Sequence, residues 1–209
     1  MKPVVVFDFD GTLVDSNQLK YDAYFQILPV SEKVEDITRQ VLSRIYEASR
    51  YVIIRELVDR LMEKGLMDIP RDTDPESLTD ELARRYGKIV LEGAMTCPEI
   101  PGAGELLDRL HRTGTPLYLS STTPEKPLNQ IVTHRGWSGY FRKVFGYPRR
   151  KEDTLLEIMA TEDIPAHRIM VVGDGESDRT SADRCGAAFA CVKEKKLPWD
   201  LIIRFATEN

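Results

Sequence analysis

Short apolar runs alternate with amphipathic stretches through much of this 209-residue chain. Val4–Phe9 is apolar apart from Asp8 and rich in β-branched residues, which is typical of a strand buried on both faces. Further strand patterns lie at 116–121, 143–145, 168–172 and 187–192, with helical patterns between them at 124–135, 152–162 and 177–185. Strands that alternate with helices predict an α/β fold with a Rossmann-like parallel sheet and right-handed crossovers.

The region 17–94 has a different character, because it contains helical patterns and no strand candidate. A helix is expected from Asn17 to Leu28, and a long amphipathic stretch continues from Val34 to about Gly65, with apolar residues at steps of three and four. This region is too long for one crossover. We therefore expect an inserted all-α cap domain at 17–94, and an α/β core formed by 1–16 and 95–209.

The second half of the predicted cap begins with a segment of loop composition, 69–75. Ser77 is a plausible N-cap of the helix that follows, with Glu81 near the capping-box position. This helix is expected to run to about Glu92.

Composition narrows the classes of partner. Hydrophobic residues make up 42% of the chain, and the net charge is -5. This acidic balance argues against non-specific binding to nucleic acid or anionic membranes, and no apolar stretch approaches the roughly 18 residues of a membrane span. The chain runs directly into a strand without a signal peptide, and its three cysteines lack metal-ligand spacing, so we expect a cytoplasmic protein with reduced thiols. The sequence leaves open whether it is a monomer or a homodimer.

The first strand ends in candidate chemistry. Asp8 and Asp10 are two residues apart, so their side chains point the same way at the carboxyl end of the strand, where open α/β sheets bind ligands. Gly11 allows a sharp turn. Two neighbouring carboxylates are costly unless a cation or a shared proton relieves them, and a hard divalent ion suits oxygen ligands. The alternative is a solvated acidic turn.

Three later positions could join the same site. Ser121 follows a strand and could bind a phosphate oxygen or cap the next helix. Lys151 could balance phosphate charge or belong to a solvated basic run. Asp174 and Asp178 lie in GDGESD after the strand at 168–172, where they could line the mouth of the sheet or form an acidic loop.

Together these motifs resemble those of the haloacid dehalogenase superfamily. The segment DFDGT at Asp8–Thr12 is similar to the first motif of that family, Ser121 to the second, Lys151 to the third, and Gly173-Asp174 with Asp178 to the fourth. The helical insertion resembles the cap of the family. The resemblance implies a haloacid dehalogenase fold.

The resemblance also implies catalytic roles. Asp8 would be the nucleophile that forms an aspartyl phosphate, and Asp10 would act as general acid and then as general base. Mg²⁺ would be held by the Asp8 carboxylate, the Asp10 carbonyl and Asp174.

The same resemblance implies the groups that surround the phosphate. Thr12, Ser121, Thr122 and Lys151 would bind its oxygens, and Asp178 would support the site without contacting the ion. Because Asp10 is present, the resemblance favours a phosphatase acting on a small phosphorylated metabolite, with a phosphomutase or a non-catalytic phosphate-binding module as alternatives.

The substrate is less defined. DSNQLK at Asp15–Lys20 and SRY at Ser49–Tyr51 resemble a subset of sugar-phosphate or polysaccharide-pathway phosphatases, whereas phosphoglycolate phosphatase and β-phosphoglucomutase share the same architecture. Arg50 precedes four apolar residues on its own helical face, where an unpaired guanidinium would be costly. It could read the non-reacting end of the substrate with help from Lys20, or it could pair with Glu47 or Glu81.

Overall fold

The computed structural model describes residues 2–45, 48–67 and 74–207. The chain divides into two compact units, one formed by Met1–Asn17 with Ala94–Asn209 and the other by Gln18–Gly93. The first unit contains a parallel sheet and the second is helical, and we describe each by itself. The expected α/β class is confirmed.

The sheet of the first unit has five parallel strands in the order β3-β2-β1-β4-β5. Each expected strand is found, with bounds β1 Val4–Phe7, β2 Leu117–Pro124, β3 Lys143–Tyr147, β4 Ile169–Gly173 and β5 Ala188–Cys191. The central strand β1 is buried along its whole length, as its continuous apolar run predicts. Its carboxyl end, where Asp8 follows, therefore lies at the middle of the sheet edge.

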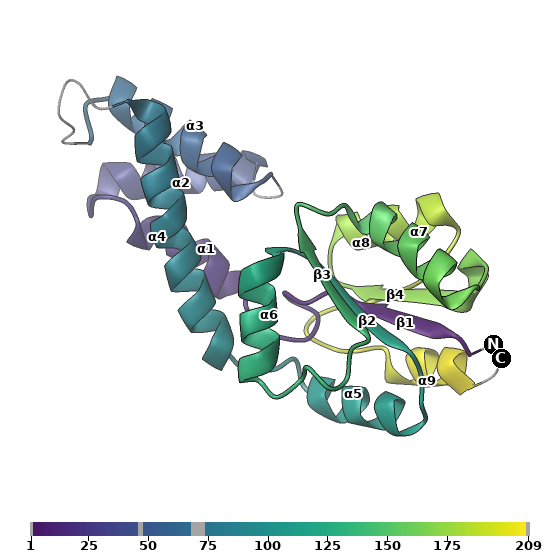
Figure 1. Ribbon diagram of the computed structural model, residues 1–209. Helices are drawn as coiled ribbons and strands as arrows, with labels where there is room; N and C mark the ends of the chain where they lie inside the picture. Colours follow the sequence, from purple (N-terminus) through teal and green to yellow (C-terminus); the bar gives the residue numbers. More distant parts are fainter. Residues whose placement is uncertain (1, 46–47, 68–73, 208–209) are drawn as a thin grey trace. The chain divides into compact units, whose positions relative to one another are not determined.

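Helices cover both faces of this sheet (Figure 1). Their bounds are α5 Ala103–Arg112, α6 Glu125–His134, α7 Lys151–Glu162, α8 Glu176–Cys185 and α9 Trp199–Thr207. Val4 and Val6 pack with Leu155 of α7 and Ala182 of α8 in one buried cluster, and α5 and α9 lie on the opposite face. Helix α9 was not anticipated from the sequence, whereas α6, α7 and α8 lie close to their expected positions.

The second unit is built from α1 Asn17–Gln26, α2 Glu32–Ile45, α3 Arg50–Glu63 and most of α4 Pro75–Thr96. The amphipathic stretch from Val34 to about Gly65 was expected to form one continuous helical element. That expectation is wrong, because the stretch forms two helices. Ser49 begins the second of them by accepting a hydrogen bond from the backbone N–H of Val52. The apolar periodicity continues across this break because both helices bury their apolar faces in one core, so periodicity alone could not reveal it.

The expected N-cap at Ser77 is also wrong. Helix α4 begins at Pro75, and the side chain of Asp74 accepts hydrogen bonds from the backbone N–H of Glu76 (3.3 Å) and of Ser77 (3.1 Å). Proline suits the first position of a helix because its missing N–H would have no partner there. Most of the loop expected at 69–75 lies outside the described residues.

The far end of α4 is fixed within the first unit. The guanidinium of Arg135 donates to the backbone oxygens of Ala94 and Cys97, and lies 5.4 Å from the ring centre of Trp137. These bonds satisfy carbonyl groups that a helix leaves without partners at its C-terminus. Cys97, like the other two cysteines, is free. No helix in the described ranges combines the length and hydrophobicity needed to cross a membrane.

Candidate active site

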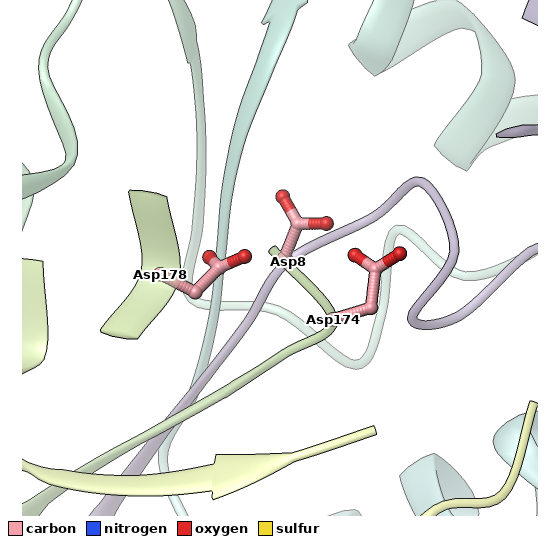
Figure 2. Close-up of side chains that lie close together, drawn as sticks. All are labelled: Asp8, Asp174 and Asp178. Carbon is pink, nitrogen blue, oxygen red and sulfur yellow. The ribbon is translucent and has the colours of Figure 1, made fainter. Parts of the chain in front are cut away.

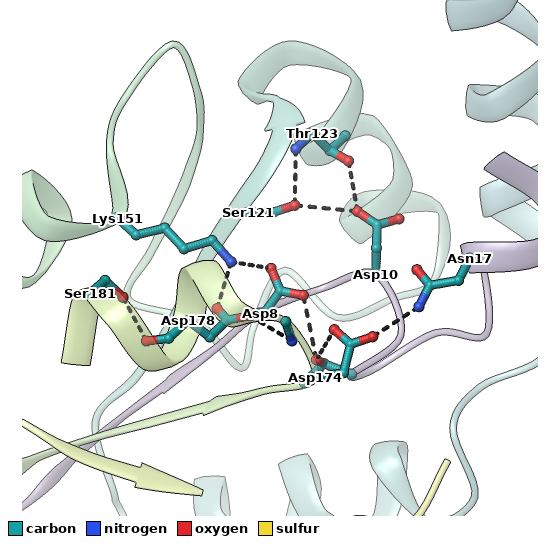
Figure 3. Close-up of polar contacts among 11 residues, drawn as sticks. Asp8, Asp10, Asn17, Ser121, Thr123, Lys151, Asp174, Asp178 and Ser181 are labelled. Carbon is teal, nitrogen blue, oxygen red and sulfur yellow. Dashed lines mark hydrogen bonds and ion pairs between the residues drawn. The ribbon is translucent and has the colours of Figure 1, made fainter. Parts of the chain in front are cut away.

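A buried lysine lies between two carboxylates at the carboxyl end of the sheet. Asp8 directly follows β1, and its backbone N–H donates to Val172 in β4 (2.8 Å). Lys151, the first residue of α7, places its Nζ 2.8 Å from Asp8 Oδ1 and 2.5 Å from Asp178 Oδ1 (Figure 3). The three side chains are only 3–10% exposed, so their charges interact with little screening by solvent.

The charge balance of this trio favours a charged lysine. Burial would lower the pKa of Lys151, but the attraction of Asp8 and Asp178 outweighs it and raises that pKa. Burial raises the pKa of Asp8, and the Lys151 ammonium opposes this rise. Burial and the neighbouring Asp8 charge raise the pKa of Asp178 to about 7. Two carboxylates thus share one ammonium, and their raised pKa values reflect the cost of holding both negative charges in a buried site.

Asp8 and Asp178 also belong to an acidic cluster with Asp174. One carboxylate oxygen each of Asp8, Asp174 and Asp178 lies within 4.8 Å of the other two, and Figure 2 shows the three groups converging. The hydroxyl of Thr12 lies between Asp8 Oδ2 (3.4 Å) and Asp174 Oδ1 (3.5 Å). A set of converging oxygen ligands with excess negative charge fits a hard divalent cation such as Mg²⁺.

Asp10 lies outside this carboxylate cluster and is held by hydroxyl groups. Its Oδ1 accepts a hydrogen bond from Ser16 (2.6 Å). Its Oδ2 accepts from Thr123 (2.8 Å) and Ser121 (3.3 Å), as Figure 3 shows. All four residues are buried. These donors fix one orientation of the Asp10 carboxylate at the sheet edge.

The structure brings together most of the residues that the sequence singled out, namely Asp8, Asp10, Thr12, Ser121, Lys151, Asp174 and Asp178. It does not place Thr122 among them. The side chain of Thr122 is exposed, and Thr123 points to Asp10 in its stead. Side chains alternate along a strand, so Ser121 and Thr123 share the face that Thr122 turns away from.

Three further residues of the site were not predicted, namely Ser16, Asn17 and Thr123. Thr123 could have been found from the alternation of β2 together with Ser121. Ser16 and Asn17 belong to the segment DSNQLK, which stood out only for its family resemblance. Nothing in that resemblance pointed to Asp10 or Asp174, because these contacts depend on how the chain turns after Gly11.

The two cap candidates lie in the helical unit. Arg50 is half-buried at the start of α3, with its guanidinium 5.3 Å from the ring centre of Tyr51. No ion pair between Arg50 and Glu81 occurs in the described part of the chain, and Glu47 lies outside it. The backbone oxygen of Lys20 accepts a hydrogen bond from the hydroxyl of Tyr86. Burial raises the pKa of Tyr24, and the charge of Arg50 partly offsets that rise.

Comparison with known proteins gives consistent matches over nearly the whole chain. A family model described as haloacid dehalogenase-like hydrolase matches residues 5–192. A phosphoglycolate phosphatase from Rhodobacter capsulatus is 24% identical over 97% of this chain and 90% of its own length.

Solved structures agree on the fold. A haloacid dehalogenase-type hydrolase from Bacillus subtilis, crystallised with magnesium bound, has a TM-score of 0.69 at 15% identity and covers 91% of this chain and 88% of its own. A Thermotoga maritima protein assigned as a β-phosphoglucomutase has a TM-score of 0.69 at 18% identity, with 98% and 91% coverage. At these identities the structural likeness establishes the fold alone.

Proposed function

Because this chain belongs to the haloacid dehalogenase-like hydrolase family, we propose that it is a Mg²⁺-dependent phosphatase that acts on a small phosphorylated metabolite. The general activity, hydrolysis of a phosphoric monoester, is supported by the family and by the phosphoglycolate phosphatase relative. The observation that carries the proposal is the position of Asp8, with Lys151 on its Oδ1 side and Asp174 on its Oδ2 side.

In this proposal Asp8 is the nucleophile. A carboxylate oxygen of Asp8 attacks phosphorus, and the bond between phosphorus and the ester oxygen breaks. Water then attacks the phosphoryl group on Asp8, releases inorganic phosphate and regenerates the carboxylate. The Lys151 ammonium lies beside the attacking group, so it can stabilise negative charge on the transferring phosphoryl group without any rearrangement.

Asp10 is the proposed general acid and base. It protonates the departing oxygen in the first step and takes a proton from the attacking water in the second. The hydrogen bonds from Ser16 and Thr123 hold its carboxylate in one orientation for both transfers. The hydroxyls of Thr12 and Ser121 are proposed to bind phosphoryl oxygens.

The proposed Mg²⁺ ligands are the carboxylates of Asp8 and Asp174 and the backbone carbonyl of Asp10. When bound, the ion would offset the repulsion between an anionic nucleophile and an anionic phosphate. Asp178 is proposed to act through Lys151, because its Oδ1 binds the ammonium and its Oδ2 accepts a hydrogen bond from the backbone N–H of Gly175.

The decisive experiment is hydrolysis of p-nitrophenyl phosphate by the wild type and by Asp8→Asn. The amide is a poor nucleophile and a weaker ligand for Mg²⁺, so we expect turnover to be abolished in the variant and in wild type treated with EDTA. A phosphoryl adduct on Asp8 should be detected by mass spectrometry after acid quenching of the wild type. Asp108→Asn is the matched control, since Asp108 pairs with Arg112 on the surface of α5.

Near wild-type activity of Asp8→Asn, or no effect of EDTA, would contradict the mechanism. A panel of phosphorylated metabolites that includes phosphoglycolate and sugar phosphates then identifies the substrate class. Interconversion of hexose 1- and 6-phosphates with little release of phosphate would instead indicate a mutase, and binding of phosphate without any turnover would indicate a non-catalytic module.

A further inference from the structure

Asp174 differs from the other two carboxylates of the acidic cluster in its surroundings. Asp8 and Asp178 are buried and both bind Lys151, whereas Asp174 is exposed. An exposed aspartate on a loop can rotate among several staggered conformations. A metal ligand that is not already oriented pays an entropic cost when the ion binds, so whatever holds Asp174 influences the affinity of the site.

Two side chains in the described part of the chain donate hydrogen bonds to Asp174. Asn17 Nδ2 lies 2.8 Å from Asp174 Oδ2 (Figure 3). Thr12 Oγ1 lies 3.5 Å from Asp174 Oδ1. The second distance is at the outer limit for a hydrogen bond, and the Thr12 hydroxyl has only one proton, which it can also give to Asp8. The amide of Asn17 is therefore the stronger restraint on Asp174.

The turn after Asp10 leaves room for this contact. Gly11 has a φ of +74°, which glycine adopts without strain. A Cβ atom at this position would lie 2.0 Å from Asp174 Oδ2 and 2.3 Å from Asn17 Nδ2, so the hydrogen bond occupies the space that a side chain would fill. Glycine is thus required here for the backbone turn and also for the Asn17–Asp174 pair.

Asn17 is itself held in place by its neighbours along the chain. It is the first residue of α1 and the last of the first compact unit. Just before it, the Ser16 hydroxyl donates a hydrogen bond to Asp10, and Asp15 forms an ion pair with Lys195 (2.7 Å). Three consecutive side chains, from Asp15 to Asn17, thus contact other parts of the first unit, and two of them bind site carboxylates. These contacts hold the backbone from which the Asn17 side chain donates.

We propose that Asn17 is a positioning residue that orients the Asp174 carboxylate for Mg²⁺; the inference rests on the proposed metal site. Partners that orient metal ligands typically contribute about 10–100-fold to metal affinity. Replacement of Asn17 by alanine removes the donor but keeps a side chain that suits a helix start. The loss should therefore appear in metal binding and leave the fold intact.

The test is calorimetric titration of Mg²⁺ into metal-free wild type, Asn17→Ala and Gln18→Ala, without substrate. Gln18 is the matched control, because it is the next residue of α1, is exposed, and donates its amide to Asp22. We expect the Kd for Mg²⁺ to rise about 10-fold or more in Asn17→Ala and to stay at the wild-type value in Gln18→Ala. In turnover assays the Mg²⁺ concentration for half-maximal rate should rise by the same factor, while kcat at saturating Mg²⁺ is largely retained.

An unchanged Kd for Mg²⁺ in Asn17→Ala would overturn the inference. If the variant differs from wild type only in a lower melting temperature in EDTA, Asn17 has a purely structural role, which would also overturn it. Because the titration needs no turnover, the two proposals fail separately. A weaker Kd in Asn17→Ala supports the role of Asn17 even if no phosphatase activity is found. If the enzyme is active and wild type and Asn17→Ala bind Mg²⁺ with the same Kd, the positioning role of Asn17 is contradicted and the proposed function still stands.

Discussion

At the scale of the residue, the site depends on which of two adjacent threonines faces Asp10. Thr123 is buried and donates to Asp10 Oδ2, whereas Thr122 is exposed. The two differ only in the side of β2 on which they lie. They therefore form a matched pair for testing whether a hydroxyl beside Asp10 contributes to turnover.

We expect Thr123→Val to lower kcat by about 10-fold or more with little change in KM. Valine keeps the shape of threonine but removes the shorter of the two hydrogen bonds to Asp10 Oδ2. A hydrogen bond to a charged group contributes about 1.5–3 kcal/mol. Thr122→Val should change kcat by less than about two-fold, as is usual for surface positions. Steady-state kinetics with p-nitrophenyl phosphate measures kcat and KM of both variants. A rise in KM alone, or equal losses in the two variants, would contradict a positioning role for Thr123.

At the scale of the element, the start of α4 shows how local hydrogen bonding decides a helix boundary. Both Asp74 and Ser77 are residue types that cap helices, and the sequence indicated Ser77. In the structure Asp74 caps, and the Ser77 hydroxyl donates to its carboxylate (3.0 Å). Hydrogen bonds from the backbone N–H groups of Ser77 and Glu76 lower the pKa of Asp74 below its ordinary value of 3.8.

Asp74→Ala should therefore lower the melting temperature at pH 7 by a few degrees, because two N–H groups lose their acceptor. Since the pKa of Asp74 is lowered in the folded state, its contribution is present above the unfolded pKa of about 3.8 and is lost as the pH falls through the folded value. The difference between wild type and Asp74→Ala should thus narrow toward pH 3. Thermal unfolding across this pH range measures it.

Ser77→Ala is the control for this prediction. It removes one side-chain hydrogen bond but leaves the backbone donors of the cap, so its effect should be smaller than that of Asp74→Ala. An equal or larger effect would favour Ser77 as the functional cap, as the sequence first suggested.

At the scale of the whole molecule, the candidate catalytic residues all lie in the sheet unit, and a substrate-binding role for Arg50 of the helical unit stays a prediction. Within the helical unit, Arg50 of α3 lies near Gly87 of α4, where a Cβ atom would lie 3.4 Å from its Nη1. The rings of Tyr24 and Tyr86 lie 4.5 Å apart. The Arg50 guanidinium, 5.3 Å from the ring centre of Tyr51, has a planar fork that suits a carboxylate or sugar hydroxyls.

We expect Arg50→Ala to lower kcat/KM for the physiological substrate by about 10-fold or more, since hydrogen bonds to charged groups contribute about 1.5–3 kcal/mol. Hydrolysis of p-nitrophenyl phosphate, which offers no comparable end group, should change much less. Arg55→Ala is the control, because Arg55 pairs with Asp59 on the exposed side of the same helix. Equal losses on both substrates together with a lower melting temperature would assign Arg50 a structural role.

The sequence by itself determined the α/β class, all five strands and the main groups of the candidate site. Buried parallel strands read as continuous apolar runs, and their carboxyl ends are marked by the polar residues that follow, as with Asp8 after β1 and Asp174 after β4. These signals depend only on residues that are neighbours along the chain, so the sequence alone reveals them. The same holds for Ser121 and Lys151, which lie at the end of a strand and the start of a helix.

Only the tertiary structure decided which groups hold the site carboxylates. Ser16 and Asn17 reach Asp10 and Asp174 because of the turn at Gly11, and the donor and acceptor of the Asn17–Asp174 bond lie 157 residues apart in the chain. The break between α2 and α3 was hidden for a related reason. Hydrophobic periodicity records which face is buried, and two successive helices that share one core can keep the same pattern across the turn between them.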